Sequence, residues 1–269
     1  MKRLLSKLAW TGRRPWLPLL RLSGVALLAL CLGAADWETI QERGYLRVGV
    51  KDNTRPLGFR DSRGQLQGLE IDLARQLAED LLGSAEALEL VPLLNQERLP
   101  ALFADRVDLV IAQMGINPAR SRVVDFSPYY YLDGAGVIVR RGGGLNSLSI
   151  QSRRLGVLAG SSAVPLLKRR FPQATLVGLS TYAEARKALI QGQIDAFVGD
   201  MSVLTGWVQT DARLEKLPVQ WSGAALGVAM PRGLQYESLR EKVNWTITRL
   251  RASGWLRRRG AAWGLFPFE

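Results

Sequence analysis

The sequence contains no histidine and a single cysteine, Cys31, among its 269 residues. Imidazole and thiolate groups bind most transition metals in proteins and complete the Ser-His and Cys-His devices of hydrolases. We therefore expect no metal, no cofactor and no such catalytic device. One cysteine also excludes an internal disulfide, so the fold must be stabilised by its core, for which 47% hydrophobic residues provide the material.

Acidic residues are absent from residues 1–35, whereas six of the 36 basic residues lie there. A short apolar run, GVALLALCLGAA at 24–35, ends this segment in small residues. A basic start, a short apolar stretch and small residues at its end are typical of a secretory signal peptide, and the run is short for a membrane span. We predict that residues 1–35 are a signal peptide, cleaved on export to the periplasm.

Two features of this leader leave alternatives open. Leu30 precedes Cys31, whereas a lipoprotein signal usually has a small residue there, which argues against a lipid anchor. GRRPWL at 12–17 loosely resembles a twin-arginine export signal, although an ordinary basic leader is the simpler interpretation. Without residues 1–35 the chain has 30 basic and 24 acidic residues. This moderate charge removes the main support for a nucleic-acid partner.

Beyond residue 36, short apolar runs alternate with segments of helical periodicity. This alternation predicts an α/β fold with parallel strands. We expect strands at 45–50, 88–94, 107–114, 153–160, 174–179 and 194–200, a strand running into a glycine loop over 134–144, and helices at 69–83, 98–106, 161–171, 181–192 and 237–254.

The stretch INPARSRVVDFSPYY (116–130) places a basic residue at an unusual position. Asn117 and Pro118 are typical of the first positions of a helix. Arg120 would then lie in the first turn, where the helix dipole disfavours a cation. We interpret Arg120 as half of an anion site, with the N–H groups of the helix start as the other half; a solvated surface charge is the alternative.

Two segments 87 residues apart share one pattern. ALFADRVDLVI (101–111) and ALIQGQIDAFV (188–198) both predict a helix, a turn and a buried strand. Asp108 and Asp195 precede these strands, and we interpret both as structural capping residues. The same offset matches Gln113 with Asp200, at the ends of the two strands. Because ligands of open α/β sheets bind beyond the carboxyl ends of strands, we expect these ends to face each other across a cleft.

The order and spacing of several motifs resemble the periplasmic amino-acid-binding proteins of ABC transporters, solute-binding protein family 3, over residues 43–266. The motifs are YLRVGV, RPLGFRDSRGQLQGLEIDLARQLA, DLVIAQMGINPARSRVVDFSPYY, LGVLAGSSA, GQIDAFVGD and SGWLRRRGAAWGL. The resemblance implies a two-lobed type II periplasmic-binding-protein fold with two crossover strands. Lobe 1 would comprise 43–133 and 230–269, and lobe 2 would comprise 134–229. It also implies a monomer without enzymatic activity that passes a free amino acid to an inner-membrane ABC permease.

The resemblance further implies the residues that bind the backbone of the amino acid. Arg120 would bind the α-carboxylate, because a guanidinium matches a carboxylate with two hydrogen bonds. Ser161 and Ser162 match a pair of small hydroxyl residues that reach the same carboxylate, although plain N-capping would explain them equally. Asp200 matches the acidic residue that binds the α-ammonium. Lobe closure would then depend on the ligand.

Three residues of lobe 1 would surround the ligand's side chain. Arg98 and Asn95 match positions at which glutamate and aspartate binders have an arginine and a serine, and Lys51 adds a second cation. Two cations near one pocket favour an acidic ligand. The alternative is that Lys51 and Arg98 are solvated and pair with neighbouring carboxylates, and that the ligand is glutamine or another polar amino acid.

Departures from the family's pattern concern the same pocket. The family usually has threonine where Gly115 and Asn117 stand, a small residue where Gln113 stands, and often aromatic residues where Thr54 and Leu57 stand. Gly115 lacks a hydroxyl, and Gln113 adds an amide to the expected binding residues. The sequence therefore predicts the α-carboxylate site more firmly than the identity of the amino acid.

An enzyme is the main competing interpretation, because periplasmic cyclohexadienyl or prephenate dehydratases share this fold. Such chemistry needs a general acid or base in the cleft. Glu70, Asp200 and Lys51 are the candidates, and the sequence shows no paired arrangement among them.

Overall fold

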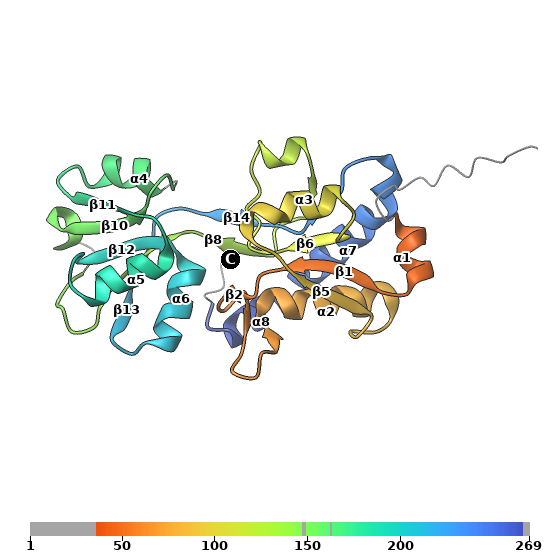
Figure 1. Ribbon diagram of the computed structural model, residues 1–269, viewed down its shortest axis with the longest axis horizontal. Helices are drawn as coiled ribbons and strands as arrows, with labels where there is room; N and C mark the ends of the chain where they lie inside the picture. Colours follow the sequence, from red (N-terminus) through yellow and green to blue (C-terminus); the bar gives the residue numbers. More distant parts are fainter. Residues whose placement is uncertain (1–35, 147–148, 162, 266–269) are drawn as a thin grey trace, which may run out of the picture. The chain divides into compact units, whose positions relative to one another are not determined.

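The computed structural model describes residues 36–146, 149–161 and 163–265, which belong to one compact unit (Figure 1). The predicted signal peptide and Cys31 lie outside the described residues. The described part contains two five-stranded sheets, and helices pack on both faces of each.

The first sheet has the strand order β5-β1-β6-β15-β7. Its strands are β5 (Leu88–Pro92), β1 (Leu46–Val50), β6 (Leu109–Ile111), β15 (Ala229–Met230) and β7 (Asp125–Phe126). β1 is parallel to β5 and β6, whereas β15 is antiparallel to β6 and β7. Leu109 and Ile111 pack toward α2 (Leu69–Leu82) and α7 (Glu237–Ala252), and Val110 packs toward α3 (Arg98–Phe103). Burial on both faces explains why β6 is apolar throughout.

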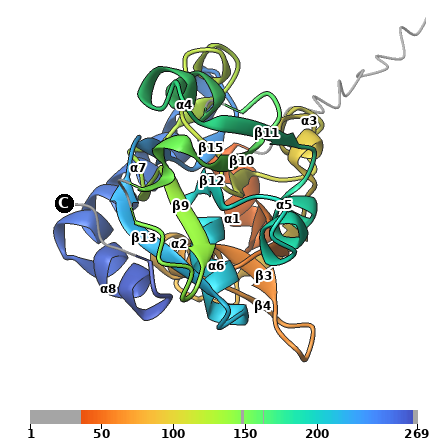
Figure 2. The ribbon, with the colours of Figure 1, turned by 90° about the vertical axis from the view of Figure 1, so that its left-hand side faces the viewer.

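The second sheet has the order β11-β10-β12-β9-β13. Its strands are β11 (Thr175–Leu179), β10 (Arg154–Leu158), β12 (Ala196–Asp200), β9 (Ala135–Arg140) and β13 (Leu214–Gln220). β10 is parallel to β11 and β12, and β9 runs antiparallel between β12 and β13. α4 (Ala163–Arg170) packs on one face, and α5 (Tyr182–Ile190) and α6 (Met201–Thr210) pack on the other (Figure 2).

Two strands connect the elements of the two sheets. β8 (Tyr131–Asp133) leads from β7 into β9, and β14 (Ala224–Leu226) leads from β13 back to β15. β8 and β14 pair antiparallel, so the outgoing and returning segments run together. A small sheet of β2 (Asn53–Thr54), β3 (Gly58–Arg60) and β4 (Leu66–Gln67) lies between β1 and α2 in the chain.

The structure confirms most of the expected elements, and it differs at the helix expected after Asn117. Only a three-residue 3-10 helix, Arg120–Arg122, forms there, so little helix dipole acts on Arg120. The long C-terminal helix is confirmed as α7, and α8 (Trp255–Ala262) follows it after Gly254, whose φ is 69°. Helix α1 (Trp37–Arg43), α6, α8 and β13 were not predicted. α6 is buried over most of its surface, so it has no clear amphipathic pattern.

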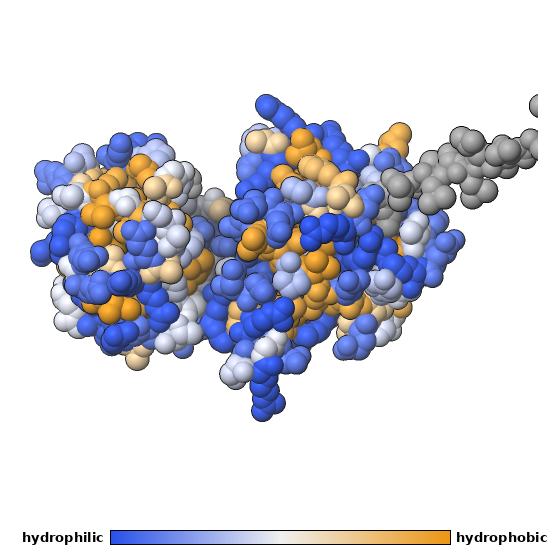
Figure 3. All heavy atoms as spheres, viewed as in Figure 1, coloured by the Kyte–Doolittle hydropathy of each residue, from blue (hydrophilic) through white to orange (hydrophobic). Residues whose placement is uncertain are grey.

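Hydrophilic residues surround smaller apolar areas on the face drawn in Figure 3. None of the helices in the described part of the chain is both long and apolar enough to cross a membrane.

Candidate ligand-binding site

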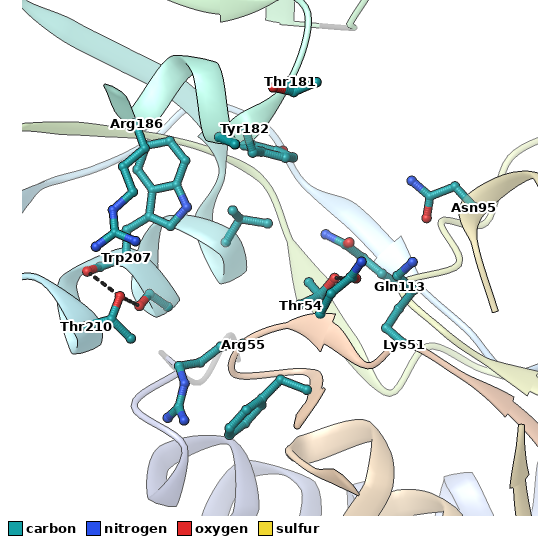
Figure 4. Close-up of a pocket in the computed structure, with 15 residues that line it drawn as sticks. Lys51, Thr54, Arg55, Asn95, Gln113, Thr181, Tyr182, Arg186, Trp207 and Thr210 are labelled. Carbon is teal, nitrogen blue, oxygen red and sulfur yellow. Dashed lines mark hydrogen bonds between the residues drawn. The ribbon is translucent and has the colours of Figure 1, made fainter. Parts of the chain in front are cut away.

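A cavity of about 540 Å³ lies between elements of the two sheets (Figure 4). Three of the residues predicted for the site, Lys51, Asn95 and Gln113, line it from the side of the first sheet. Residues of α5 and α6 that were not predicted line it from the other side, among them Tyr182, Arg186 and Trp207. The cavity is therefore bordered by segments that follow strands of the first sheet and by helices that pack on the second, with polar groups from each.

Lys51 follows the last residue of β1 and is only 4% exposed. Its Nζ donates a hydrogen bond to the carbonyl oxygen of Leu93 at 3.1 Å. Burial lowers the pKa of Lys51, and the positive charge of Arg98 lowers it further. An ammonium has three donors, and this is its one hydrogen bond among the described residues. The remaining donors are available to a group in the cavity.

Arg98 begins α3, is 8% exposed and is not among the residues that line the cavity. Its Nε donates to the carbonyl of Asn95 at 3.0 Å. Its Nη1 donates to the carbonyls of Ala112 at 2.7 Å and Gln113 at 3.0 Å. Burial and the neighbouring charge of Arg120 lower the pKa of Arg98. The guanidinium is thus committed to backbone carbonyls, and the predicted contact with a ligand's side chain stays a prediction.

Gln113 lies two residues beyond β6 and has a φ of 49°. Its N–H donates to Oε1 of Glu70 at 2.6 Å, and the hydroxyl of Tyr130 donates to the same oxygen at 2.6 Å. Glu70, in the first turn of α2, is fully buried, and its Oε2 has no hydrogen-bond partner among the residues that the structure describes. Burial raises the pKa of Glu70 to about 7, although both hydrogen bonds act in the opposite direction.

Asp200 ends β12 and precedes α6. Its Oδ2 accepts hydrogen bonds from the Tyr182 hydroxyl at 2.8 Å and from Nε2 of Gln113 at 3.4 Å. Desolvation raises the pKa of Asp200. The structure thus brings together the two residues that the 87-residue offset matches.

Arg120 and Gly115 are close to each other but are not among the residues that line the cavity. Nη1 of Arg120 donates to the carbonyl of Gly115 at 2.7 Å, and its N–H donates to Oδ1 of Asn117 at 2.9 Å. The N–H of Arg120, expected to face an anion, is therefore bonded within the loop. Arg120 is half-buried and forms no ion pair with an acidic side chain among the described residues.

Ser161 lies after β10, next to Gly160, whose φ is 73°. Its Oγ is buried and has no hydrogen-bond partner in the described part of the chain, so the hydroxyl does not cap a helix there. α4 begins at Ala163, two residues later than the start of the expected helix. Ser162 lies outside the described residues.

The residues missed by the sequence analysis come from α5 and α6. Tyr182 follows the N-cap Thr181 at the end of β11, and Trp207 is the aromatic residue in the middle of α6. Arg186 pairs with Asp211 at 3.2 Å, although its Nε is buried and has no hydrogen-bond partner within residues 36–146, 149–161 and 163–265. The one signal for Tyr182 was its position at a helix start beyond a parallel strand. The described residues include no group of His, Cys, Asp and Glu arranged to hold a metal.

Comparison with known proteins identifies the family of this chain. Residues 46–266 match the bacterial extracellular solute-binding proteins, family 3. The glutamine-binding protein of Geobacillus stearothermophilus is 31% identical over 199 residues, with 73% of this chain and 76% of the relative covered. The glutamine-binding protein GlnH of an ABC transporter from Bacillus subtilis is 28% identical over 253 residues, covering 88% and 92%.

Among solved structures, an ancestral cationic amino acid solute-binding protein superposes with a TM-score of 0.71 at 27% identity, covering 84% of this chain and 98% of the other. The expected fold is confirmed: an α/β type II periplasmic-binding-protein fold in which two strands cross between the lobes. The match spans most of the chain. The chain therefore belongs to the bacterial extracellular solute-binding proteins of family 3.

Proposed function

We propose that the protein captures a polar amino acid, glutamate or aspartate before others, in the cavity between its two lobes. The observation that carries this proposal is Lys51, a buried ammonium at the cavity with one hydrogen bond among the described residues. A buried charge is costly unless it is paired, and a carboxylate of the ligand's side chain would pair with it.

The backbone of the amino acid would be bound by charges of opposite sign from the two lobes. Arg120, which has no acidic partner in the described part of the chain, would bind the α-carboxylate, with Ser161 as a further donor. Asp200 would bind the α-ammonium. The lobes proposed are 43–133 with 230–269, and 134–229. The exported protein would act as a monomer in the periplasm and deliver its ligand to an ABC permease.

Glutamine is the second candidate, and a specific contact favours it. The hydrogen bonds of Arg98 go to backbone carbonyls, so Lys51 is the one predicted side-chain cation that lines the cavity. A single ammonium can be satisfied by an amide oxygen as well as by a carboxylate. A basic amino acid is disfavoured, because its side chain would bring a second cation to Lys51.

A dehydratase is less well supported than a binding protein. Glu70 is fully buried and does not line the cavity, so its carboxyl group has no access to a substrate there. Asp200 does not line the cavity either, so Lys51 is the one of the three candidate acids or bases that does. Incubation with prephenate, followed by a search for an aromatic product, tests this alternative directly.

The decisive experiment is calorimetric titration of residues 36–269 with glutamate, aspartate, glutamine and arginine. We expect heat with the acidic amino acids and glutamine and none with arginine. Lys51→Met should reduce affinity for glutamate more than for glutamine, because only the former loses an ion pair. Arg120→Ala should abolish binding of every amino acid. Absence of binding to any amino acid would refute the proposal.

A further inference from the structure

Gln113 has a backbone conformation that its residue type does not favour. Its φ of 49° lies in the left-handed region, where a side chain crowds the backbone and glycine is the usual occupant. Asp105 is the one other non-glycine residue with a positive φ in the described part of the chain. The surrounding structure must therefore hold residue 113 in place.

Two buried side chains, a carboxyl group and a guanidinium, contact the backbone of Gln113, one at each of its polar groups. The carboxyl group of Glu70 accepts from its N–H at 2.6 Å. The guanidinium of Arg98 donates to its carbonyl at 3.0 Å and, through the same nitrogen, to the preceding carbonyl of Ala112 at 2.7 Å. Hydrogen bonds that involve ionised groups are stronger than those between neutral groups.

Glu70 and Arg98 come from different helices and have no contact with the cavity. Glu70 lies in the first turn of α2, and Arg98 is the first residue of α3. Both are buried, and neither lines the cavity. Their effect on a ligand must therefore pass through the residue that they hold.

The contacts of Glu70 and Arg98 with the backbone set the direction of the Gln113 side chain. It lines the cavity, and its Nε2 reaches Oδ2 of Asp200 at 3.4 Å. In Figure 4 its amide lies near the head of Lys51, on the side of the cavity opposite Trp207. A change in the backbone at residue 113 would move this amide away from the cavity.

We propose that Glu70 and Arg98 are positioning residues that clamp the backbone of Gln113, so that its side chain contributes to ligand binding beside Asp200. The role in binding rests on the proposed function, whereas the clamp itself does not. It also gives Arg98 a role other than the direct contact with a ligand expected from the sequence.

A double-mutant cycle tests the clamp, because glycine at position 113 adopts the left-handed conformation without help. We expect Glu70→Leu to weaken binding of glutamate, measured by calorimetry, about tenfold and Gln113→Gly to weaken it about tenfold. The double variant should bind within about twofold of Gln113→Gly. Losses that multiply to about a hundredfold, or an unchanged affinity in Glu70→Leu, would overturn the proposal.

Two further variants separate the clamp from a general effect on the core. Glu70→Gln keeps an oxygen that can accept from Gln113, so we expect affinity within about threefold of wild type. Tyr130→Phe removes the other hydrogen bond to the same carboxyl oxygen without touching residue 113, and its affinity should also stay within about threefold. A tenfold loss in Tyr130→Phe would indicate that the core, and not residue 113, carries the effect.

Amide hydrogen exchange of the wild-type protein tests the clamp without a ligand. It needs no variant, so a failure to fold cannot affect the result. The amide proton of Gln113 should exchange slowly although it lies outside the strands and helices. Exchange at the rate of an exposed loop would refute the clamp. If no amino acid binds the protein, the proposed function fails while this measurement still decides on the clamp.

Discussion

Strands β6 and β12 occupy matching places in the two sheets, and they begin alike but end differently. Asp108 and Asp195 precede them. The N–H of Asp108 donates to the carbonyl of Arg47 at 2.8 Å, and its Oδ2 accepts from the N–H of Arg47 at 2.7 Å. Asp195 forms the same two bonds with Arg154, at 2.9 Å and 3.0 Å. These contacts confirm that both aspartates cap the neighbouring strand.

The ends of the two strands have diverged. Gln113 follows β6 with an amide, and Asp200 ends β12 with a carboxylate that accepts a hydrogen bond from it. The two strands thus share a structural contact at their beginning and carry different polar groups at their end.

The two aspartates that precede β6 and β12 also differ in burial. The side chain of Asp108 is completely buried and binds both Arg43 and Arg47, whereas the side chain of Asp195 is 20% exposed and, among the described side chains, pairs with Arg154. Breaking a buried ion pair leaves an uncompensated charge, while an exposed pair is largely replaced by water. The same device should therefore contribute very differently to stability in the two lobes.

Asp108→Ala should cause the largest effect. We expect it to lower the free energy of unfolding by about 3 kcal/mol, because two guanidinium groups and the N–H of Arg47 lose their common partner. Urea denaturation followed by circular dichroism measures this loss. If Asp108→Ala lowers the free energy of unfolding no more than Asp195→Ala does, then burial does not make the contacts of Asp108 more important for stability than those of Asp195.

Asp200→Asn should have the next largest effect, on binding and not on folding. The ammonium of the ligand would lose its counter-charge, and we expect affinity to fall about a hundredfold, or about 3 kcal/mol. Calorimetry measures the affinity, and a thermal melt should show near wild-type stability. Asp108→Ala is the matched control. The folded fraction of this variant should bind the amino acid with wild-type affinity, because Asp108 contributes to stability and not to the site.

The pH dependence of stability should report on two buried carboxyl groups, Glu70 near the end of β6 and Asp133 near the end of β12. Burial raises the pKa of Glu70 to about 7 and that of Asp133 to about 6. Both folded values lie above the unfolded ones, so the stabilising contribution is full at acidic pH and is lost as pH rises. We expect stability to decrease between about pH 4.5 and pH 7, by no more than about 3 kcal/mol from Glu70.

Urea midpoints across this range measure the effect. Glu70→Gln should remove the larger part of the pH dependence, and Asp133→Asn the smaller part at lower pH. A wild-type protein whose stability rises steadily from pH 4.5 to pH 7 would contradict both assignments.

Asp195→Ala should have the smallest effect, a shift in the urea midpoint well below that of Asp108→Ala. Hydrogen bonds from Arg154 hold the pKa of Asp195 below its ordinary value. Its contribution is therefore present at neutral pH and disappears as pH falls through the acidic range. The difference between variant and wild type should narrow in acid, and a difference that grows there would contradict this sign.

The sequence predicted the features that repeat or alternate, and it missed those that depend on three-dimensional neighbours. The paired strands, the capping aspartates and the meeting of Gln113 with Asp200 all follow from a periodic pattern and one offset. The commitment of Arg98 to the carbonyls of Ala112 and Gln113 does not, because a motif shows that an arginine is present and not where its donors point. Tyr182 and Trp207 enter the cavity from helices whose own patterns describe only packing.

The order of the strands also sets the order in which the protein can be completed as the chain is synthesised. The second sheet uses one continuous stretch, from β9 at residue 135 to β13 at residue 220. The first sheet cannot close until Ala229 and Met230 are available, because β15 lies between β6 and β7. Because the chain is synthesised from its N-terminus, the second sheet can be completed before the first sheet, although the first sheet begins earlier in the chain.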